Sequence, residues 1–323
     1  MSEEPKKKKG CLGCSLPMLI GLTVVFLALL IVSFVAGPLG QNLLGDIGLP
    51  DWLSVPQPIP ELPAEVVLHI FGFPITNSVI AAWITIIFLV GFSYVVTRRM
   101  KIIPGRLQAA FEFLLGWLYN LCTSVAGEEN GRKFFPIVAT IFLFVGFNAW
   151  LGLLPGFGSI TVNTAEGGVH LLRPANTDIN MPLALALVSF VFVEFTGIRK
   201  LGKSYMKKFI NVTEFRRGLS QVFRGNIKSG FLGMFTGGIN IFTGLLEGFT
   251  EFIRIISLTF RLFGNMTAGE ILLLVVAFLI PWLFAVPFYG LELLIGYIQA
   301  LIFAGLTLIF VTVAVIPHEG EAH

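Results

Sequence analysis

The sequence predicts an all-α membrane protein of about six membrane helices, including a long, tilted C-terminal helical hairpin, plus one interfacial amphipathic helix. Composition is the first reason: apolar residues fill 55% of the 323 positions and charged residues 13%, whereas soluble domains carry roughly 25% charged residues. A second reason is the recurrence of apolar runs of about 20 residues, which as helices cross a hydrocarbon core of ~30 Å. The third is that basic residues collect in alternate loops.

Four apolar runs have the length of single spans, and they occupy residues 15–36, 76–96, 134–154 and 181–197. Two longer apolar stretches follow at 239–280 and 283–316. As helices rising ~1.5 Å per residue they would measure ~63 Å and ~51 Å, which exceeds the hydrocarbon thickness. We therefore expect each stretch either to break or to lie steeply tilted. Pro281 and Pro287 mark the turn between them, because proline tends to end a helix.

The distribution of Lys and Arg predicts which loops are cytoplasmic, since basic residues accumulate on that side of a membrane. Residues 37–75 contain no basic residue and 155–180 contain only Arg173, whereas 98–133 contain six and 199–228 contain nine. The N-terminus also begins with a run of lysines. We expect both termini to be cytoplasmic, with residues 317–323 forming a short tail.

The N-terminal part has two interpretations. Residues 1–36 combine a basic start with an apolar run, so they form either an extra anchor helix or a cleaved signal peptide. The run exceeds the 7–15 residues of a typical signal-peptide core, which favours the anchor. Residues 37–75, with five prolines between 50 and 63, are expected to form an extended extracytoplasmic connector. Cys11 and Cys14 have metal-knuckle spacing, but no second Cys or His pair accompanies them, so acylation or no role is favoured.

The core is predicted to cover residues 76–316 and to end in a hairpin over 231–316. Between its first two spans, apolar residues recur at helical spacing; they are Leu107, Phe111, Leu114, Leu115 and Leu118. We expect an amphipathic helix at the cytoplasmic interface, with a packing helix between spans as the alternative.

The C-terminal hairpin contains six ionisable residues, which are Glu247, Glu251, Arg254, Arg261, Glu270 and Glu292. An ionised side chain at the bilayer centre costs at least ~2.5–3.5 kcal/mol, so these residues must face protein, water or a partner's charge. Intramembrane ionisable residues usually mark ion pathways, and they indicate a transport function here. We expect Arg254 to face a partner or to reach the interface rather than to act in the pathway.

Helical geometry singles out one arginine. At about 100° per residue, one stripe of the first hairpin helix is polar and contains Arg254, Ser257, Arg261 and Asn265. Glu270 points about 180° away from Arg261 and lies ~13.5 Å further along the axis. We therefore expect the carboxylate that neutralises Arg261 to come from outside its own helix.

Antiparallel pairing about Pro281 predicts the register of the hairpin. Arg261 becomes level with Gln299, and Glu270 becomes level with Glu292. Level positions need not face each other, so the pairing of these side chains stays open.

Three segments resemble the F-type ATP synthase subunit a family. The run Ser-Leu-Thr-Phe-Arg-Leu-Phe-Gly-Asn-Met-Thr-Ala-Gly-Glu at 257–270 closely resembles the family's signature. Residues 297–303, Tyr-Ile-Gln-Ala-Leu-Ile-Phe, are similar to its second signature, and residues 173–180 to a segment that opens an earlier helix. The resemblance covers roughly residues 75–316 and leaves out the first apolar run, which shorter bacterial members lack.

The resemblance implies roles for individual residues. Arg261 matches the family's essential arginine of ion translocation. Polar positions that line the two half-channels are implied at Glu247, Ser257, Asn265, Glu270 and Gln299. Glu292 occupies a position where some members have histidine, and Asn176 and Asp178 are assigned to an access channel.

The resemblance also implies a mechanism and its partners. The protein would be the stator subunit beside a ring of c subunits, whose buried carboxylate meets Arg261, and would bind the peripheral stalk subunit b within the ATP synthase of a bacterial inner membrane. Arginine cannot pass on a proton, whereas a partly buried glutamate can bind and release one near neutral pH. No catalytic site, cofactor, metal or nucleic acid is expected, and H⁺ rather than Na⁺ is the expected ion.

Two other classes fit the sequence less well. A secondary transporter usually carries paired half-helices in two related repeats, and the sequence has no such repeat. A membrane-embedded enzyme is disfavoured because the sequence lacks His-Glu-x-x-His, Gly-x-Ser-x-Gly and a phosphate-cradling glycine loop. The four histidines lie in predicted loops or the tail and are not expected to bind metal.

Overall fold

The computed structural model describes residues 16–45, 64–98, 100–154, 157, 160–164, 167–202, 205, 209, 212–223 and 227–316. The N-terminal cysteines, the connector prolines and residues 317–323 lie outside the described residues, so their predicted roles stay predictions. The chain folds as two compact units. The smaller consists of Met1–Glu61 with Ala268–Leu294, and the larger of Leu62–Thr267 with Ile295–His323.

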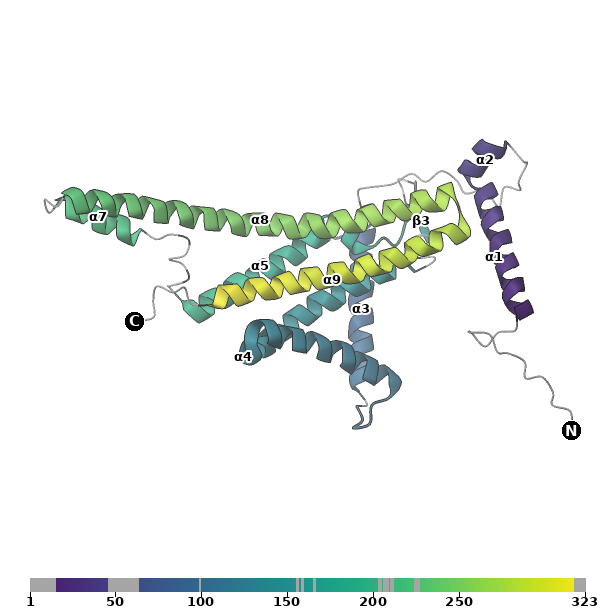
Figure 1. The fold of residues 1–323 in the computed structure, drawn as a ribbon, viewed down its shortest axis with the longest axis horizontal. Coiled ribbons are helices and arrows are strands. Elements are labelled where there is room, and N and C mark those ends of the chain that lie inside the picture. Colours follow the sequence, from purple (N-terminus) through teal and green to yellow (C-terminus); the bar gives the residue numbers. More distant parts are fainter. Residues whose placement is uncertain are drawn as a thin grey trace. The chain divides into compact units, whose positions relative to one another are not determined.

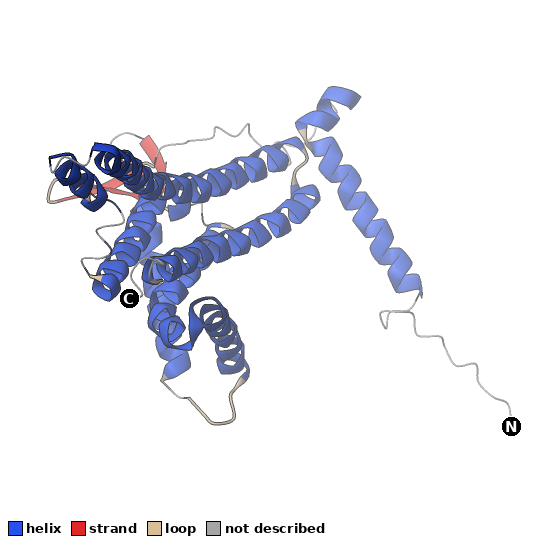
Figure 2. Cartoon of the chain, turned by 60° about the vertical axis from the view of Figure 1, so that its left-hand side comes forward, coloured by secondary structure: helices blue, strands red, loops and turns tan. Residues whose placement is uncertain are grey.

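Helices dominate the described part of the chain, and short strands are the exception (Figures 1 and 2). Six helices are long and apolar enough to cross a membrane; they are Pro17–Ala36, Asn77–Thr97, Arg106–Gly152, Asn180–Leu201, Ser229–Leu279 and Leu283–Val315. This confirms the predicted all-α membrane fold, and the spans fall where hydropathy placed them.

In the larger unit, α3 (Asn77–Thr97), α4 (Arg106–Gly152) and α5 (Asn180–Leu201) supply three spans. The long α4 bends at Gly127, whose φ of 77° is a backbone conformation that glycine adopts most readily. The bend separates the predicted amphipathic helix from the span that follows. Leu118 is fully buried in the core while Leu107 is exposed, so this helix packs against the core at one end, as the alternative interpretation held.

The remaining helices are α7 (Thr213–Phe223), α8 (Ile227–Leu279) and α9 (Val286–Val315). α8 does not break: it is a continuous helix of 53 residues, or about 80 Å at ~1.5 Å per residue. A helix of that length must be steeply tilted to stay within a bilayer. α7 runs back along the beginning of α8 (Figure 1), and Gly237 permits this because a Cβ there would lie 2.3 Å from the Phe215 backbone nitrogen.

One face of α8 and one face of α9 share a core with α4 and α5 in the larger unit. α8 contributes Leu258, Leu262 and Met266, and α9 contributes small or aromatic residues such as Ala300 and Phe303. All five are nearly or fully buried. These parts of the two helices are therefore fixed by apolar packing, which sets the positions of the polar residues beside them.

The smaller unit joins α1 (Leu16–Ala36) and α2 (Pro38–Leu44) to the turn between α8 and α9. Ser33 Oγ donates a hydrogen bond to the Pro281 carbonyl oxygen, and Gly37 lies against the Leu279 carbonyl. The turn consists of Pro281 and the 3-10 helix η3 (Trp282–Ala285). Pro287 was predicted to mark the turn but stands in the first turn of α9, where its missing N–H breaks no helical hydrogen bond.

The beginning of the connector is helical rather than extended as predicted, and its end folds into a strand hairpin. Pro38 opens α2, since proline suits the first helical turn. Strands β1 (Val66–Ile70) and β2 (Phe73–Thr76) pair antiparallel. A second hairpin, β3 (Thr161–Thr164) with β4 (Gly167–His170), lies between α4 and α5 and was not predicted. Both hairpins are too short to give a clear alternating pattern in the sequence.

Candidate functional site

The first part of the site is a face of α8 and α9 in the larger unit, here called the arginine face and made of Arg261, Asn265 and Gln299. Arg261 is half-buried and, within the described part of the chain, takes part in no hydrogen bond or ion pair. One helical turn further on, Asn265 Nδ2 donates to Gln299 Oε1 at 2.8 Å. Gln299 is 2% exposed, and its Nε2 has no hydrogen-bond partner among the described residues. The face therefore presents a cation and a buried donor that the described chain leaves unsatisfied.

The register of the hairpin differs from the prediction by one helical turn. Gln299 faces Asn265 rather than Arg261. Eleven residues earlier in α8 and eleven later in α9, the Arg254 guanidinium lies 3.8 Å from the centroid of the Phe310 ring, which repeats the observed register. The shift applies to this part of the hairpin, because Glu292, nearer the turn, lies against Gly269 close to its predicted level.

The smaller unit holds the two hairpin glutamates that were predicted to be level. Glu292 is 5% exposed, and its carboxylate lies directly against the backbone of Gly269. A Cβ at position 269 would lie 2.1 Å from Glu292 Oε1, so the absence of a side chain there lets the carboxylate approach α8. Glu270 is the next residue and is half-buried. The structure thus brings Glu292 to the level of Glu270.

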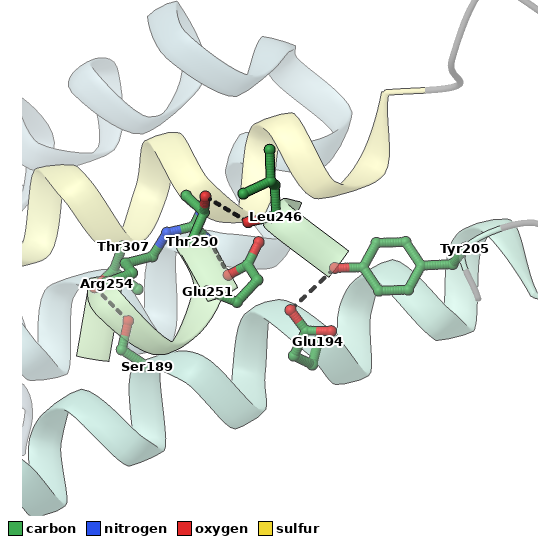
Figure 3. A network of polar contacts seen from close by, with 8 residues as sticks. All are labelled: Ser189, Glu194, Tyr205, Leu246, Thr250, Glu251, Arg254 and Thr307. Atoms are coloured by element: carbon green, nitrogen blue, oxygen red, sulfur yellow. Dashed lines mark hydrogen bonds and ion pairs between the residues drawn. The ribbon is translucent and has the colours of Figure 1, made fainter. Parts of the chain in front are cut away.

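A second group of polar side chains surrounds Arg254 (Figure 3). Arg254 Nη1 pairs with Glu251 Oε2 at 2.5 Å, and the two side chains are 21% and 6% exposed. Arg254 was expected to face a partner or to reach the interface, but it is held between Glu251 and the ring of Phe310. The direction of a long side chain depends on contacts with neighbouring helices. Spacing along one helix does not predict these contacts.

Tyr205 and Glu194 lie beside this group and were not predicted as site residues. The Tyr205 hydroxyl donates to Glu194 Oε1 at 3.1 Å, and Tyr205 is 2% exposed. Burial, followed by the charge of Glu194, raises the pKa of the Tyr205 hydroxyl, so at neutral pH it stays a donor. Glu251 and Arg254 act on the same hydroxyl, with opposite signs. The only signal for them in the sequence is weak: Glu194 is an acid near the end of a span.

The other predicted α8 residues lie in different surroundings. Glu247 is half-buried, one turn before Glu251. Ser257 is exposed and lies one turn before Arg261. Both remain on the same helix as the arginine face, and neither is fully enclosed by the chain.

Asn176 and Asp178 belong to a buried polar seam that joins α3, α4 and α5. Its buried members are Ser78, Thr85, Asn148, Asn176 and Asp178, and the exposed Asn180 lies at its edge. Ser78 Oγ donates to Asp178 Oδ2 at 2.7 Å, and Asn180 donates to Asp178 Oδ1 from its backbone N at 3.1 Å and from its side chain at 3.0 Å.

The seam continues into α4. The Asn176 side chain donates to the Val145 carbonyl at 3.2 Å, and Asn148 Nδ2 donates to Thr85 Oγ1 at 3.0 Å. Asn176 Oδ1 is buried and has no partner among the described residues. The seam can hold three helices together, and it also supplies polar groups at the depth of a membrane span.

The described residues contain no group of three or more His, Cys, Asp or Glu side chains that could hold a metal ion. The side chains of the site are a fixed cation, carboxylates, amides and hydroxyls, which can bind and transfer protons or hold an ion by charge.

Comparison with known proteins gives one family. Residues 79–312 match the family described as ATP synthase A chain. The ATP synthase subunit a of Gloeobacter violaceus is 34% identical over 245 residues, which cover 76% of this chain and 86% of that protein. The subunit a of Helicobacter pylori is 30% identical over 76% of this chain and 92% of its own length, and ATP synthase subunit a 3 of Pelobacter propionicus is 32% identical over 73% and 86%.

Proposed function

The chain belongs to the ATP synthase subunit a family, and from that premise we propose that it forms two offset proton half-channels against a ring of c subunits. Proton flow through the half-channels turns the ring and drives ATP synthesis by the rest of the complex. The chain itself then carries no catalytic site. It is a multi-pass protein of the bacterial inner membrane, with cytoplasmic termini, and is held by the peripheral stalk subunit b.

Arg261 is the observation that carries this proposal. It is a permanent cation within a span, and the described part of the chain offers it no ion pair. A charge at membrane depth costs several kcal/mol unless something compensates it. An ionised carboxylate from a neighbouring subunit is the simplest compensation, and a ring of identical subunits would supply one after another.

The two half-channels use different residues. Glu270 and Glu292 line the extracytoplasmic one, because they are level, half-buried or buried, and close to the hairpin turn. Glu247 serves the cytoplasmic one, since it lies towards the basic end of α8. Asn176 and Asp178 belong to an access path for protons, to which Asn176 Oδ1 contributes a buried acceptor that has no hydrogen-bond partner among the described residues.

Arg261 separates the two paths. Its guanidinium stays protonated at any physiological pH, so it attracts an ionised ring carboxylate but cannot hand a proton from one path to the other. Asn265 and Gln299, one turn away, offer neutral groups to the same carboxylate. Each proton that crosses a potential of 100 mV delivers about 2.3 kcal/mol, so several protons together can drive the release of one ATP.

Purification of the chain from mildly solubilised membranes tests this function. A stator subunit should emerge with a ring of small subunits and a head that hydrolyses ATP. A secondary transporter should emerge without either. Isolation of the intact chain alone under conditions that preserve other membrane complexes would overturn the proposal.

A further inference from the structure

α8 carries two arginines on one side. Arg254 and Arg261 are seven residues apart, so they point within about 20° of each other and lie ~10.5 Å apart along the helix. A carboxylate that moves past this stripe and is attracted to Arg261 would also be attracted to Arg254, unless the charge of Arg254 is already compensated.

The structure compensates Arg254 within the chain. Its guanidinium pairs with Glu251 at 2.5 Å, and the Glu251 side chain is 6% exposed. The centroid of the Phe310 ring, on α9, lies 3.8 Å from the guanidinium carbon, and the ring can also attract the cation. Figure 3 shows Arg254 and Glu251 on adjoining turns of α8, with Glu194 and Tyr205 beside them.

Arg261 lacks this arrangement. The positions three and four residues away from it, at which an acid could pair along the helix, hold Ser257, Leu258, Gly264 and Asn265. Arg254, in contrast, has Glu251 three residues before it. The level of α9 that faces Arg261 in the observed register holds Phe303, which is fully buried in the core.

We propose that Glu251 cancels the charge of Arg254 and, with Phe310, keeps its side chain within the chain, so that Arg261 is the arginine of this stripe that binds the ring carboxylate. This positioning role rests on the proposed function. Without Glu251, Arg254 would become a second cation about two helical turns before Arg261. It would hold an ionised ring carboxylate and slow the rotation.

Other charged and titratable groups near the Glu251–Arg254 pair limit how much the removal of Glu251 slows pumping. Glu247 lies one turn before Glu251 on α8, and Glu194 lies on α5 with the Tyr205 hydroxyl bound to it. α9 faces the group with Thr307 and Phe310, which carry no charge. Glu194 can compensate part of the Arg254 charge when Glu251 is removed, so Glu194→Gln alone should have the smaller effect.

The test is ATP-driven proton pumping by the assembled complex in membrane vesicles. Glu251→Gln should slow pumping about tenfold, and Arg254→Gln only about twofold, because removing the cation leaves no competitor for the ring carboxylate. The double variant Glu251→Gln with Arg254→Gln should pump within about threefold of the original protein. Glu251→Asp keeps the charge and should stay close to normal.

A matched control uses the other ion pair of the same spacing. Glu214 and Arg217 on α7 pair at 2.7 Å, but both side chains are well exposed. Glu214→Gln should leave pumping unchanged, since an exposed pair contributes little. If Glu251→Gln alone fails to assemble, the double variant carries the test, because it leaves no unpaired charge at the site.

The outcomes separate this inference from the function on which it rests. Normal pumping by Glu251→Gln, or a double variant as slow as that single variant, would overturn the inference. If the Glu251–Arg254 pair had only a structural role, the double variant would be as slow as Glu251→Gln. If Arg261→Ala retains coupled pumping, the proposed function itself fails; if Arg261→Ala abolishes pumping and the double variant does not recover, only the role of Glu251 is wrong.

Discussion

In the polar seam, the Asp178 carboxylate accepts three hydrogen bonds from Ser78 and Asn180, whereas on the arginine face Arg261 makes none within the described part of the chain. Both residues lie in or beside membrane spans of the same unit. The seam satisfies its charge with its own helices, and so it can form before any partner binds. In the proposed function, a carboxylate from another subunit completes the arginine face. A charged group that is hydrogen-bonded within the chain indicates a structural role. A charged group without such a contact indicates where a partner binds.

The glutamates of the smaller unit give the largest expected effect among the variants that sharpen this comparison. Glu270→Gln or Glu292→Gln alone should slow proton flux about fivefold, because the remaining acid can still transfer the proton. The double glutamine variant should slow flux ~100-fold or more, since general acid–base groups contribute ~10²–10⁴. Proton uptake by vesicles measures all four combinations. Strict multiplication of the two single effects would count against a shared relay, and no effect of Glu292→Gln in either background would leave it only an anchor for the turn.

Replacement of Asp178 tests whether the seam has only a structural role. Asp178→Ala leaves the Ser78 and Asn180 donors without their acceptor, which should destabilise the complex by about 2–4 kcal/mol. The loss should appear as a smaller amount of assembled complex and a lower temperature of inactivation. Asp178→Asn should retain most of the complex yet slow proton flux per complex about threefold, because the acid has been removed from the access path. Full flux in that variant would show that the seam only holds helices. Thr97→Val, which removes an exposed hydroxyl, is the control and should change neither quantity.

The smallest effect on activity is expected from cysteine variants that test which side of the membrane each loop faces. Phe71 and Ile102 are both fully exposed and lie in loops predicted to face opposite sides of the membrane. In a background without the native cysteines, Phe71→Cys should react with an impermeant thiol reagent from outside, and Ile102→Cys only from inside, with activity essentially unchanged. The reverse pattern would invert the orientation and exchange the two proposed half-channels.

Much of this architecture could be predicted from the sequence because it depends on one-dimensional quantities. Apolar run length placed the six spans, and helical spacing identified Arg261 as an arginine without an acid within reach on its own helix. The level of Glu270 and Glu292 followed from folding the chain near Pro281.

Features that depend on three-dimensional packing could not be predicted. Gln299 lies opposite Asn265 rather than Arg261, which depends on how the two helices pack along their length. The contact between the Arg254 guanidinium and Phe310 depends on an aromatic ring of α9. The contact between Tyr205 and Glu194 depends on a residue that follows the end of α5. Spacing along a single helix contains no information about these partners.

Replacement of Arg261 tests the central claim most directly. Arg261→Ala should abolish both ATP-driven proton pumping and ATP synthesis, while the complex still assembles in the membrane, because the ring carboxylate loses the cation that it must meet. Arg261→Lys should not restore full activity, since a lysine is a point charge that can lose its proton when buried. Loss of coupled proton transport with an intact complex is the predicted result. Normal proton-coupled ATP synthesis by the alanine variant would contradict the account.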